Sequence, residues 1–271
     1  MPDPPYHQPI GTPFIELQTL DSTNYYAFEQ IHAGLAQHGQ AIFAHEQTAG
    51  KGQRGKKWSS SKGVNITLSI VIKPAPLAVT QQFHLSACVA VAVHEFFSKY
   101  AGKDTRIKWP NDLYWKDRKA GGILIESIVR SSESGVLSRE SRVRNRETGV
   151  HGWQWGVIGI GININQTSFP PELPNPVSLK QITGKNFDSV ELAKEICRLF
   201  NFHFEKLITG GFEDIYARYL SSLYKINERM RLKKDNRVFE TMIKSVSPTG
   251  RLVVQHSIEE EFDFGEVEWV I

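Results

Sequence analysis

Several features that would mark other classes of protein are scarce in this sequence. Its 271 residues contain only two cysteines, Cys88 and Cys197, which excludes a disulfide framework and a cysteine-rich zinc site. Both cysteines lie in apolar, helix-like stretches, so we expect buried thiols in a reducing compartment. No two histidines stand at the spacing of metal ligands, and we therefore expect no structural zinc.

Long apolar runs and a strong excess of one charge are also missing. The longest apolar stretch, residues 87–97, is interrupted by His94 and Glu95 and is too short to span a bilayer. The proline-rich N-terminus lacks the apolar core of a signal peptide. The net charge is only +3, which does not by itself imply a nucleic-acid partner. These absences favour a cytoplasmic globular protein with no membrane partner.

The apolar periodicity predicts a mixed arrangement of strands and helices. Strands are expected at 14–20, 40–47, 65–73 (half-buried), 105–109, 121–129 and 153–164. Helices are expected at about 22–37, 79–100, 189–207 and 212–223. Because the two types do not alternate regularly, an α+β fold with a mixed sheet is favoured over a doubly wound one. The polar segment 131–151 predicts a long exposed hairpin loop.

The sequence pattern changes near residue 226. From there on, short β-like segments are separated by turn signals at 235–236 and 247–250. The acidic run 259–261 reads as an exposed β-turn region. We therefore divide the chain into a larger domain, residues 1–225, and a small all-β domain, residues 226–271.

A glycine-rich loop at residues 49–58 reads A-G-K-G-Q-R-G-K-K-W. It carries four cations: Lys51, Arg54, Lys56 and Lys57. Its G-x-G-x-x-G pattern is not a dinucleotide fingerprint, because no helix follows it directly and no acidic residue stands about 20 positions on. The cations repel one another unless an anion binds. We therefore expect a loop that is mobile without ligand and ordered by a bound phosphate.

Two further segments belong to the same chemistry. K-W-P-N-D at 108–112 combines an ammonium, an indole, an amide and a carboxylate, and R-K-A-G-G-I-L-I-E at 118–126 follows at hairpin distance. This spacing returns Lys119 to the same end of the sheet, beside glycines that let a ligand approach the backbone. Alone, K-W-P-N-D would be a turn after a strand, and the strand G-I-G-I-N at 159–163 would be core. Together they indicate nucleotide chemistry.

These motifs resemble those of the biotin protein ligases, the biotin–[acetyl-CoA-carboxylase] ligase family. The segment Ser22-Thr23-Asn24, the glycine loop, K-W-P-N-D and the two later segments occur in the family's order over residues 14–166. The resemblance implies a mixed-sheet catalytic domain of the biotin/lipoate ligase type, similar to class II synthetases, with a small C-terminal SH3-like β-barrel. Some members begin with a DNA-binding domain. Too few residues precede residue 14 for one, so we expect a monofunctional ligase without a DNA partner.

The resemblance also implies an activity and a set of site residues. Members activate biotin with Mg·ATP to biotinyl-5′-AMP and transfer biotin to one lysine of a biotin carboxyl carrier protein. A homodimer is compatible with the family. The implied catalytic residues are Lys119, Lys51 and Arg54. The implied biotin-binding residues are Ser22, Thr23, Asn24, Gln47, Gly50, Lys51, Lys119, Gly121 and Gly122. The implied ATP-binding residues are Lys51, Arg54, Trp58, Lys108, Asn111, Asp112 and Asn163, with Asp112 holding Mg²⁺ through water.

Two positions of the glycine loop depart from the family's usual pattern. Gln53 stands where many members carry arginine, so Arg54 is expected to substitute for it. Lys51 also replaces a frequent arginine, which keeps the charge and loses the bidentate geometry. Three alternatives stay open: a lipoate–protein ligase of the same fold, a nucleic-acid-binding module, and a catalytically dead biotin-binding protein. Competition between biotin and lipoate tests the first, salt-dependent binding of nucleic acid without ATP turnover tests the second, and labelling of a carrier domain by wild type and Lys119→Ala tests the third.

Overall fold

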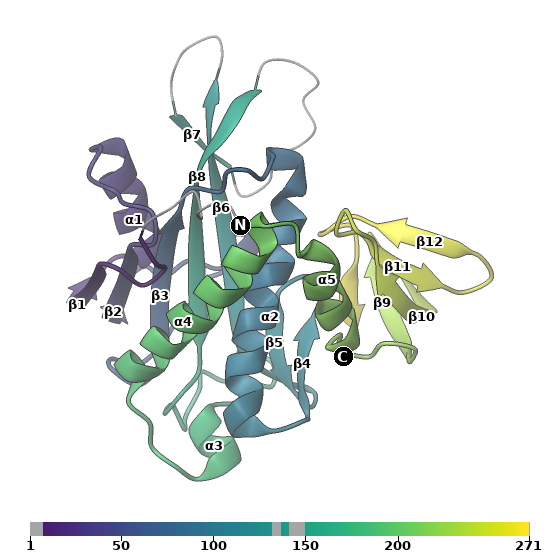
Figure 1. Cartoon of the computed structure of the whole chain (residues 1–271). Helices are drawn as coiled ribbons and strands as arrows, with labels where there is room; N and C mark the ends of the chain where they lie inside the picture. Colours follow the sequence, from purple (N-terminus) through teal and green to yellow (C-terminus); the bar gives the residue numbers. More distant parts are fainter. Residues whose placement is uncertain (1–7, 132–136, 141–149, 271) are drawn as a thin grey trace.

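The chain folds around an eight-stranded mixed sheet with helices on both faces (Figure 1). The computed structural model describes residues 8–131, 137–140 and 150–270. The strand order is β1-β2-β3-β8-β6-β5-β4, and β7 pairs with β6. The strands are β1 (Phe14–Leu20), β2 (Ala41–Gln47), β3 (Ile66–Ile72), β4 (Thr105–Lys108), β5 (Asp112–Trp115), β6 (Arg118–Ser131), β7 (Leu137–Glu140) and β8 (Val150–Ile162). Since β1 and β2 are parallel and the other pairs antiparallel, the predicted mixed sheet is confirmed.

One face of the sheet is covered by the long helices. These are α2 (Gln82–Ala101), which follows the 3₁₀ turn η2 (Val79–Gln81), α4 (Ser189–Ile208), α5 (Phe212–Ser221) and the short α3 (Leu179–Thr183). Alternate residues of the central strands, such as Leu68 and Ile160, are buried in this layer. Both cysteines are buried there as predicted, and burial raises the pKa of the Cys197 thiol to about 12.

The opposite face is covered only in part. Helix α1 (Thr23–His32) lies across β2, β3 and β8, and a smaller apolar cluster that includes Ala27, Val71 and Val157 fills the space beneath it. Strand β3 is therefore buried along its whole length, and the prediction that it is half-buried was wrong. The remaining part of this face carries the glycine loop, which contains the 3₁₀ turn η1 (Gln53–Gly55).

Helix α1 is shorter than predicted. Gly34 takes the left-handed conformation, with φ +72°, and its N–H bonds the carbonyl of Ile31 at 3.1 Å. The N–H of Leu35 bonds the carbonyl of Gln30 at 2.9 Å. This pattern caps the last carbonyl groups and ends a helix. The predicted end near residue 37, with Gly39 as the stop, was wrong because Gly34 stops the helix first.

The segment predicted as a long exposed loop, residues 131–151, is partly a sheet extension. Strands β6 and β8 reach into it, and β7 pairs with residues 127–130 of β6. The loop prediction was therefore wrong for these residues. The arginines at 142, 144 and 146 lie outside the described part of the chain.

The C-terminal part forms a separate five-stranded antiparallel sheet in the order β12-β11-β10-β9-β13. Its strands are β9 (Arg229–Lys234), β10 (Arg237–Val246), β11 (Leu252–Gln255), β12 (Glu259–Phe262) and β13 (Glu268–Val270). The acidic run 259–261 pairs with β11, so its interpretation as a turn was wrong. Phe262 is buried at the end of this run, and alternation explains why Glu259 and Glu261 face outward while Glu260 is partly buried.

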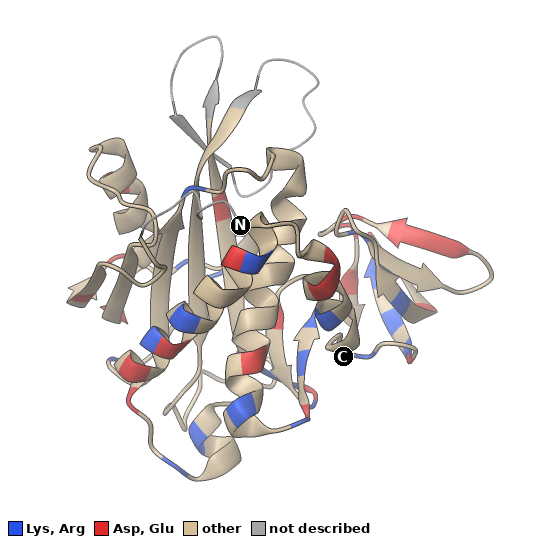
Figure 2. Cartoon of the chain, in the orientation of Figure 1, with Lys and Arg blue, Asp and Glu red and all other residues tan. Residues whose placement is uncertain are grey.

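Charged residues of both signs are interspersed over the helices and the C-terminal sheet (Figure 2). Many are paired at the surface, as Lys194 is with Glu191 and Lys206 with Asp214. Within the described residues, no helix combines the length and apolarity needed to cross a bilayer.

Candidate active site

The floor of the candidate site is a row of small residues across four strands. Thr67 of β3 pairs with Gly161 of β8, Gly161 with Gly122 of β6, and Gly122 with Asp112 of β5. Cross-strand partners share one face of a sheet. Because the flanking Leu68 and Ile160 point into the helix-covered core, this row lies on the opposite, partly open face.

Three glycines on this face make room for named side chains. A Cβ atom at Gly122 would lie 2.9 Å from Asp112 Oδ1, and one at Gly159 would lie 2.5 Å from Asn24 Oδ1. A Cβ atom at Gly161 would lie 2.6 Å from the indole of Trp58. The glycines therefore admit side chains of the protein itself, whereas the sequence suggested that they let a ligand approach the backbone.

Lys119 reaches this face because of a β-bulge. Leu113 pairs with Gly121 and Tyr114 pairs with Lys119, so Ala120 is an extra residue in β6. Ala120 is buried in the helix-side core. A regular strand would place Lys119 on the same side as Gly121, and the bulge turns it to the face of Asp112.

Neighbouring segments satisfy the backbone of this bulge. The N–H of Asn163 donates to the carbonyl of Ala120 at 2.8 Å. The N–H of Lys119 donates to Asn175 O, and the carbonyl of Lys119 accepts from the N–H of Val177, both at 2.9 Å. The side chain of Asn163 donates to the carbonyl of Val177 at 3.2 Å. Asn163 therefore holds the backbone that carries Lys119.

Lys119 and Asp112 form an ion pair on the glycine floor. Lys119 Nζ lies 2.7 Å from Asp112 Oδ1, and the two side chains are 38% and 30% exposed. Both groups are accessible to a ligand while remaining close enough to fix one another. A half-exposed ion pair of this kind contributes little to the free energy of folding. We therefore regard ligand binding as its main role.

Lys108 lies beside this pair in a more buried setting. Its ammonium group is 4.8 Å from the ring centre of Tyr114 and 5.4 Å from that of Trp269. Burial lowers the pKa of Lys108 to about 8, with further lowering by the charges of Lys119 and Lys56, and Asp112 opposes the shift. The site is thus electropositive before any anion arrives.

Replacing Lys108 by methionine is expected to stabilise the fold at neutral pH. Below pH 8 the wild-type lysine is charged in both the folded and unfolded states, so burial of the charge costs on the order of 3 kcal/mol. Between pH 8 and the ordinary lysine pKa of 10.5, the unfolded chain binds the extra proton, so wild type gains stability as pH rises.

Urea unfolding of wild type and Lys108→Met at pH 7 and pH 9.5 measures this difference. The gap in unfolding free energy should be larger at pH 7 and shrink at pH 9.5. Lys194→Met, which alters an exposed lysine of α4, serves as the control. A gap that is equal at both pH values would contradict the buried charge.

The glycine loop is folded back over the floor. Within it the N–H of Gly52 donates to Lys56 O at 2.7 Å and the N–H of Trp58 donates to Gly50 O at 3.0 Å. The indole of Trp58 lies on Gly161, and its Nε1 is buried without a hydrogen-bond partner. The loop therefore contains a buried polar donor whose hydrogen bond is not satisfied within the described residues.

The tip of the loop touches two other parts of the chain. Gln53 Nε2 donates to Asn111 Oδ1 at 2.8 Å and to the carbonyl of Ile123 at 3.0 Å. Arg54, with φ 55°, lies against Gly265 of the C-terminal part, where a Cβ atom would be 3.5 Å from its guanidinium carbon. Lys51 points elsewhere, with Nζ 5.8 Å from the ring centre of Tyr25 in α1.

The start of α1 contributes a buried polar network. Gln47 Oε1 accepts from the N–H of Thr23 at 2.7 Å and from its hydroxyl at 3.1 Å. Ser69 Oγ lies 2.7 Å from Thr23 Oγ1 and 2.6 Å from Asn24 Oδ1. Asn24 Nδ2 donates to Glu126 Oε2 at 2.7 Å. Ser22 is the N-cap residue of α1, but its hydroxyl does not cap the helix.

Two residues of this network were missed from the sequence. Ser69 is fully buried and Glu126 is 9% exposed. The signal was present, because each is a polar residue inside an otherwise apolar strand, and buried polar groups need specific partners. Gln53 was not assigned a role either, although the structure gives its amide two acceptors.

K-W-P-N-D is held mainly by structural contacts. Trp109 Nε1 donates to the carbonyl of Gly250 at 3.0 Å, and its ring contacts Phe264 edge-on at 5.8 Å. The hydroxyl of Tyr219 donates to Pro110 O at 2.8 Å. Asn111 Nδ2 donates to Ile123 O at 2.8 Å. The motif therefore connects the floor of the site to α5 and to the C-terminal sheet.

Many of the predicted residues are brought together in small groups, while Gly121 faces the helix side and Lys51 and Arg54 point away from the Lys119–Asp112 pair. Lys119, Asp112 and Gly122 are in contact, and Lys108 lies nearby. Gly50, Gln47 and Trp58 meet where the loop begins, since a Cβ atom at Gly50 would lie 2.4 Å from Trp58 O and 3.0 Å from Gln47 Nε2. Gly121 packs against Gly161 O on β8. Thr23, Asn24 and Gln47 share the buried network.

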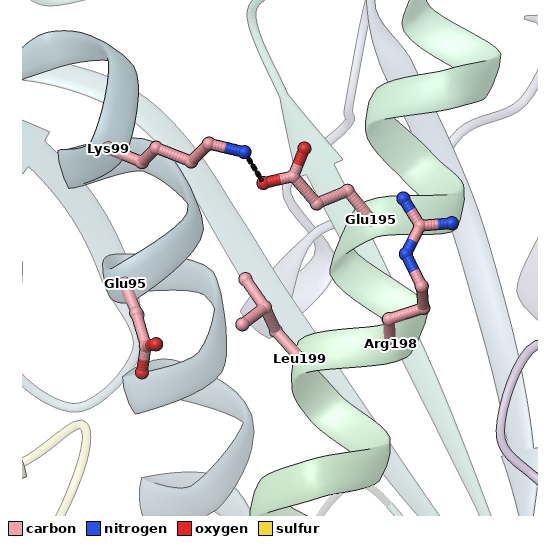
Figure 3. A pocket seen from close by; sticks show the side chains of 5 residues that line it. All are labelled: Glu95, Lys99, Glu195, Arg198 and Leu199. Atoms are coloured by element: carbon pink, nitrogen blue, oxygen red, sulfur yellow. Dashed lines mark hydrogen bonds and ion pairs between the residues drawn. The ribbon is translucent and has the colours of Figure 1, made fainter.

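A separate cavity of about 510 Å³ lies on the helix side, between α2 and α4 (Figure 3). It is lined by Glu95, Lys99, Glu195, Arg198 and Leu199. Lys99 Nζ donates to Glu195 Oε1 at 2.8 Å, so part of its charge is already paired. None of the predicted site residues lines it.

The two ends of the site offer different chemical groups to a ligand. The Lys119–Asp112 end, with Lys108 and the loop cations, can neutralise anionic groups such as a carboxylate and a phosphate. The Thr23–Asn24 end offers hydrogen-bond donors and acceptors in a buried setting. Together they can bind a molecule that carries an acidic group at one end and a polar, hydrogen-bonding group at the other.

Comparison with known proteins agrees with this geometry. The model of the biotin/lipoate A/B protein ligase family matches residues 16–138. The chain is 32% identical over 250 residues to the bifunctional ligase/repressor BirA of Bacillus spizizenii, which covers 91% of this chain and 70% of that protein. It is 29% identical over 248 residues to the biotin–[acetyl-CoA-carboxylase] ligase of Paracoccus denitrificans, covering 88% and 92%.

Solved structures show the same fold. The biotin protein ligase of Aquifex aeolicus in complex with biotin and ATP superposes with a TM-score of 0.74 and 22% identity, covering 95% of this chain and 98% of that one. The biotin/lipoate ligase fold implied by the sequence is therefore confirmed. The match to BirA over more than two thirds of both chains places this chain in the biotin/lipoate A/B protein ligase family, among the biotin protein ligases.

Proposed function

We propose that the protein activates biotin with ATP to biotinyl-5′-AMP and transfers the biotinyl group to a lysine of a biotin carboxyl carrier protein. The observation that carries this function is the Lys119–Asp112 pair on the glycine floor, with a buried polar network at the other end. The similarity to biotin ligases supports the choice of biotin.

In the first step, a carboxylate oxygen of biotin attacks the α-phosphorus of ATP. The bond to the bridging oxygen of the β-phosphate breaks, and pyrophosphate leaves with the electron pair. Two anions must approach each other, so the site has to offset their repulsion. Lys119 binds the biotin carboxylate and the α-phosphate, and Lys51 and Arg54 of the loop assist, because charge-assisted hydrogen bonds are the strong ones.

In the second step, the ε-amine of the acceptor lysine attacks the acyl carbon of the adenylate. The bond between that carbon and the phosphate oxygen breaks, AMP leaves, and the amine releases a proton as the amide forms. Lys119 and the loop cations stabilise the charge on the departing AMP. The carrier domain must reach the same open face of the sheet that holds the Lys119–Asp112 pair.

Magnesium enters with ATP, and Asp112 is the residue that fits it. Mg²⁺ keeps several waters and uses one or two carboxylates together with substrate phosphates. Among the described residues, no group of three His, Cys, Asp or Glu side chains could hold a metal alone. A single accessible carboxylate beside the phosphate site is what such a shared ion requires. When bound, the ion would supply charge neutralisation on the phosphates.

The polar network at the start of α1 binds the ureido head of biotin. Thr23, Asn24 and Gln47 are the groups that contact it or fix one another. The proposed set also includes Ser22 and the backbone of Gly121 and Gly122. Ser69 and Glu126 orient this network from β3 and β6. A ligand that cannot form hydrogen bonds with this network would leave buried polar groups unpaired and would bind much more weakly.

Thr23→Val is expected to raise the KM for biotin about three- to tenfold while leaving the KM for ATP within about twofold. The substitution keeps the shape and removes a hydroxyl that contacts Gln47 and Ser69, and one hydrogen bond is worth about that factor. Steady-state kinetics with each substrate varied measure the two constants. Thr19→Val, at an exposed position of β1, is the control. Equal changes in both constants would place Thr23 outside the biotin site.

The ATP end is formed by Trp58, Lys108, Asp112 and the loop cations. The indole of Trp58 lies on Gly161, on the same face as Asp112, which supports its placement near the base. Asn111 and Asn163 were assigned to the nucleotide from the sequence. Because their amides bond backbone carbonyls, we propose that they support the nucleotide site by holding Ile123 and the segment after β8 in place.

The function is tested by pyrophosphate release and by labelling of a carrier domain. The protein should release pyrophosphate with biotin and ATP and should incorporate labelled biotin into a carrier domain. Preference for lipoate in the same assay would instead favour the lipoate ligase. Salt-dependent binding of generic nucleic acid without ATP turnover would favour the nucleic-acid-binding module, which the interspersed charges of Figure 2 argue against. We expect the reaction to take place in the cytoplasm.

A further inference from the structure

Two aromatic rings hold the ammonium group of Lys108, and they come from different parts of the chain. Lys108 pairs with Asp112 across β4 and β5, so its side chain starts on the face of the glycine floor. Its Nζ lies 4.8 Å from the ring centre of Tyr114 on β5 and 5.4 Å from that of Trp269 on β13. Both distances are within the range of a cation–π contact. Because β13 belongs to the C-terminal sheet, that sheet supplies one of the two rings.

A third ring fixes the spacing of the other two. Tyr224, in the segment between α5 and β9, has its ring centre 5.2 Å from that of Tyr114 and 5.9 Å from that of Trp269. Its hydroxyl donates to Asp117 Oδ1 at 2.6 Å, and its N–H donates to the carbonyl of Ile107 at 2.9 Å. These bonds attach the segment to β4 and to the turn between β5 and β6. The two rings around Lys108 are therefore packed against a common support.

Trp269 is placed by strand pairing and packing. It pairs with Leu232 of β9. Its Nε1 is buried without a hydrogen-bond partner among the described residues, so a hydrogen bond does not account for a tryptophan at this position. An aliphatic residue would occupy the strand without burying a donor, but only an aromatic ring attracts an ammonium group to its face. The contact with Lys108 is therefore the interaction that distinguishes tryptophan from leucine here.

Lys108 depends on such a contact because its surroundings repel it. The charges of Lys119 and Lys56 both act on its ammonium group, and Asp112 opposes them. A lysine side chain is flexible and strongly hydrated, so it would turn toward water unless the site attracts it. One of its three N–H groups donates to the Tyr114 hydroxyl at 3.2 Å. Within the described residues no second acceptor lies at hydrogen-bond distance, which leaves N–H groups for an anion on the floor.

We propose that Trp269 is a positioning residue of the ATP site, which holds the ammonium group of Lys108 where a phosphate of ATP can accept its N–H groups. The role toward ATP rests on the proposed function, whereas the contact between Trp269 and Lys108 does not. The C-terminal sheet then contributes to the first reaction step through a side chain that acts on another side chain. Its loss should affect ATP more than biotin, because the Thr23–Asn24 network lies at the other end of the site.

NMR of the ligand-free protein tests the contact directly. Protons above the face of an aromatic ring resonate upfield, so the ε-methylene protons of Lys108 should be shifted upfield, and Lys108→Met assigns their signal. In Trp269→Leu this upfield shift should fall by about half, because one of the two rings is lost. Trp269→Phe keeps a ring and should retain most of the shift. Phe239→Leu, which removes a ring of the same sheet that contacts Phe262, is the matched control and should leave it unchanged.

Kinetics then separate positioning from a general loss of structure. Trp269→Leu should raise the KM for ATP about tenfold and leave the KM for biotin within about twofold, because one phosphate contact is misplaced. Trp269→Phe should keep the KM for ATP within about threefold of wild type. In a Lys108→Met background, adding Trp269→Leu should cause less than about a twofold further change, because the lysine that it positions is gone. If Trp269→Leu does not fold, Trp269→Met fills more of the same space and replaces it.

Three results would overturn the proposal: an unchanged upfield shift in Trp269→Leu, an unchanged KM for ATP in that variant, or full additivity with Lys108→Met. Equal rises in both KM values would likewise reduce Trp269 to a structural residue. Failure of the proposed function gives a different result. If the shift falls in Trp269→Leu but even wild type releases no pyrophosphate with biotin and ATP, the contact is confirmed, and the role toward ATP is rejected together with the proposed function.

Discussion

Replacing Lys119 by alanine is expected to lower kcat/KM for biotin transfer about 100- to 1,000-fold, because the ammonium group acts where two anions react. The loss corresponds to about 2.7–4 kcal/mol of transition-state stabilisation. Pyrophosphate release and carrier labelling should fall together, since one cation serves both steps in the proposed mechanism. This is the largest single effect that the geometry of the site predicts.

The same substitution should leave the fold nearly unchanged. The Lys119–Asp112 pair is 38% and 30% exposed, and exposed pairs contribute at most about 1 kcal/mol to folding. A loss of activity in a protein that unfolds at nearly the wild-type urea concentration therefore assigns Lys119 to chemistry. Lys119→Arg should recover only part of the activity, because the guanidinium group differs in shape and in the directions of its donors.

The chain offers a matched control for this experiment. Lys194 and Glu191 form a surface pair with the same 2.7 Å separation, on α4 at the other side of the sheet. Lys194→Ala removes a lysine and an ion pair of equal geometry without touching the site. If Lys194→Ala lowered activity as much as Lys119→Ala, or if Lys119→Ala labelled the carrier at the wild-type rate, the role of Lys119 would be refuted.

Much of the site could be predicted because its motifs are local. The glycines of 159–161 and 121–122 indicate close approach to a strand whatever the partner is, and the structure supplies partners in Asn24, Trp58 and the Lys119–Asp112 pair. The strand and helix pattern likewise follows from apolar periodicity. The predicted end of α1 near residue 37 was wrong because Gly34, about one turn earlier, already ends the helix.

The remaining features depend on contacts between distant residues. The bulge at Ala120 depends on the register between β5 and β6. The local sequence around Lys119 does not determine which residue is the extra one. Gln53 contacts Asn111 and Ile123, which lie 58 and 70 positions further along the chain. Nothing in the sequence signalled these contacts, so the neutral amide of Gln53 received no role there.

Gly161→Ala is expected to lower kcat/KM about 100-fold through Trp58. The new methyl carbon would lie 2.6 to 2.9 Å from three indole atoms, so the ring must leave its place on the floor. Misplacement of a substrate-contacting group by about 1 Å costs roughly 100-fold in rate. Since Gly161 has ordinary strand geometry and Trp58 lies on a loop, the strand itself should tolerate alanine with a small loss of stability.

Two comparisons show whether the effect passes through Trp58. Gly156→Ala, on the same strand, meets the Ile72 side chain at 3.2 Å in the helix-side core and should leave kcat/KM within about threefold. In a double-mutant cycle, adding Gly161→Ala to Trp58→Ala should cause little further loss, because the colliding indole is already gone. If the two losses instead added in full, the methyl group would be excluding the substrate itself, and the floor of β8 rather than the tryptophan above it would set the position of the adenylate.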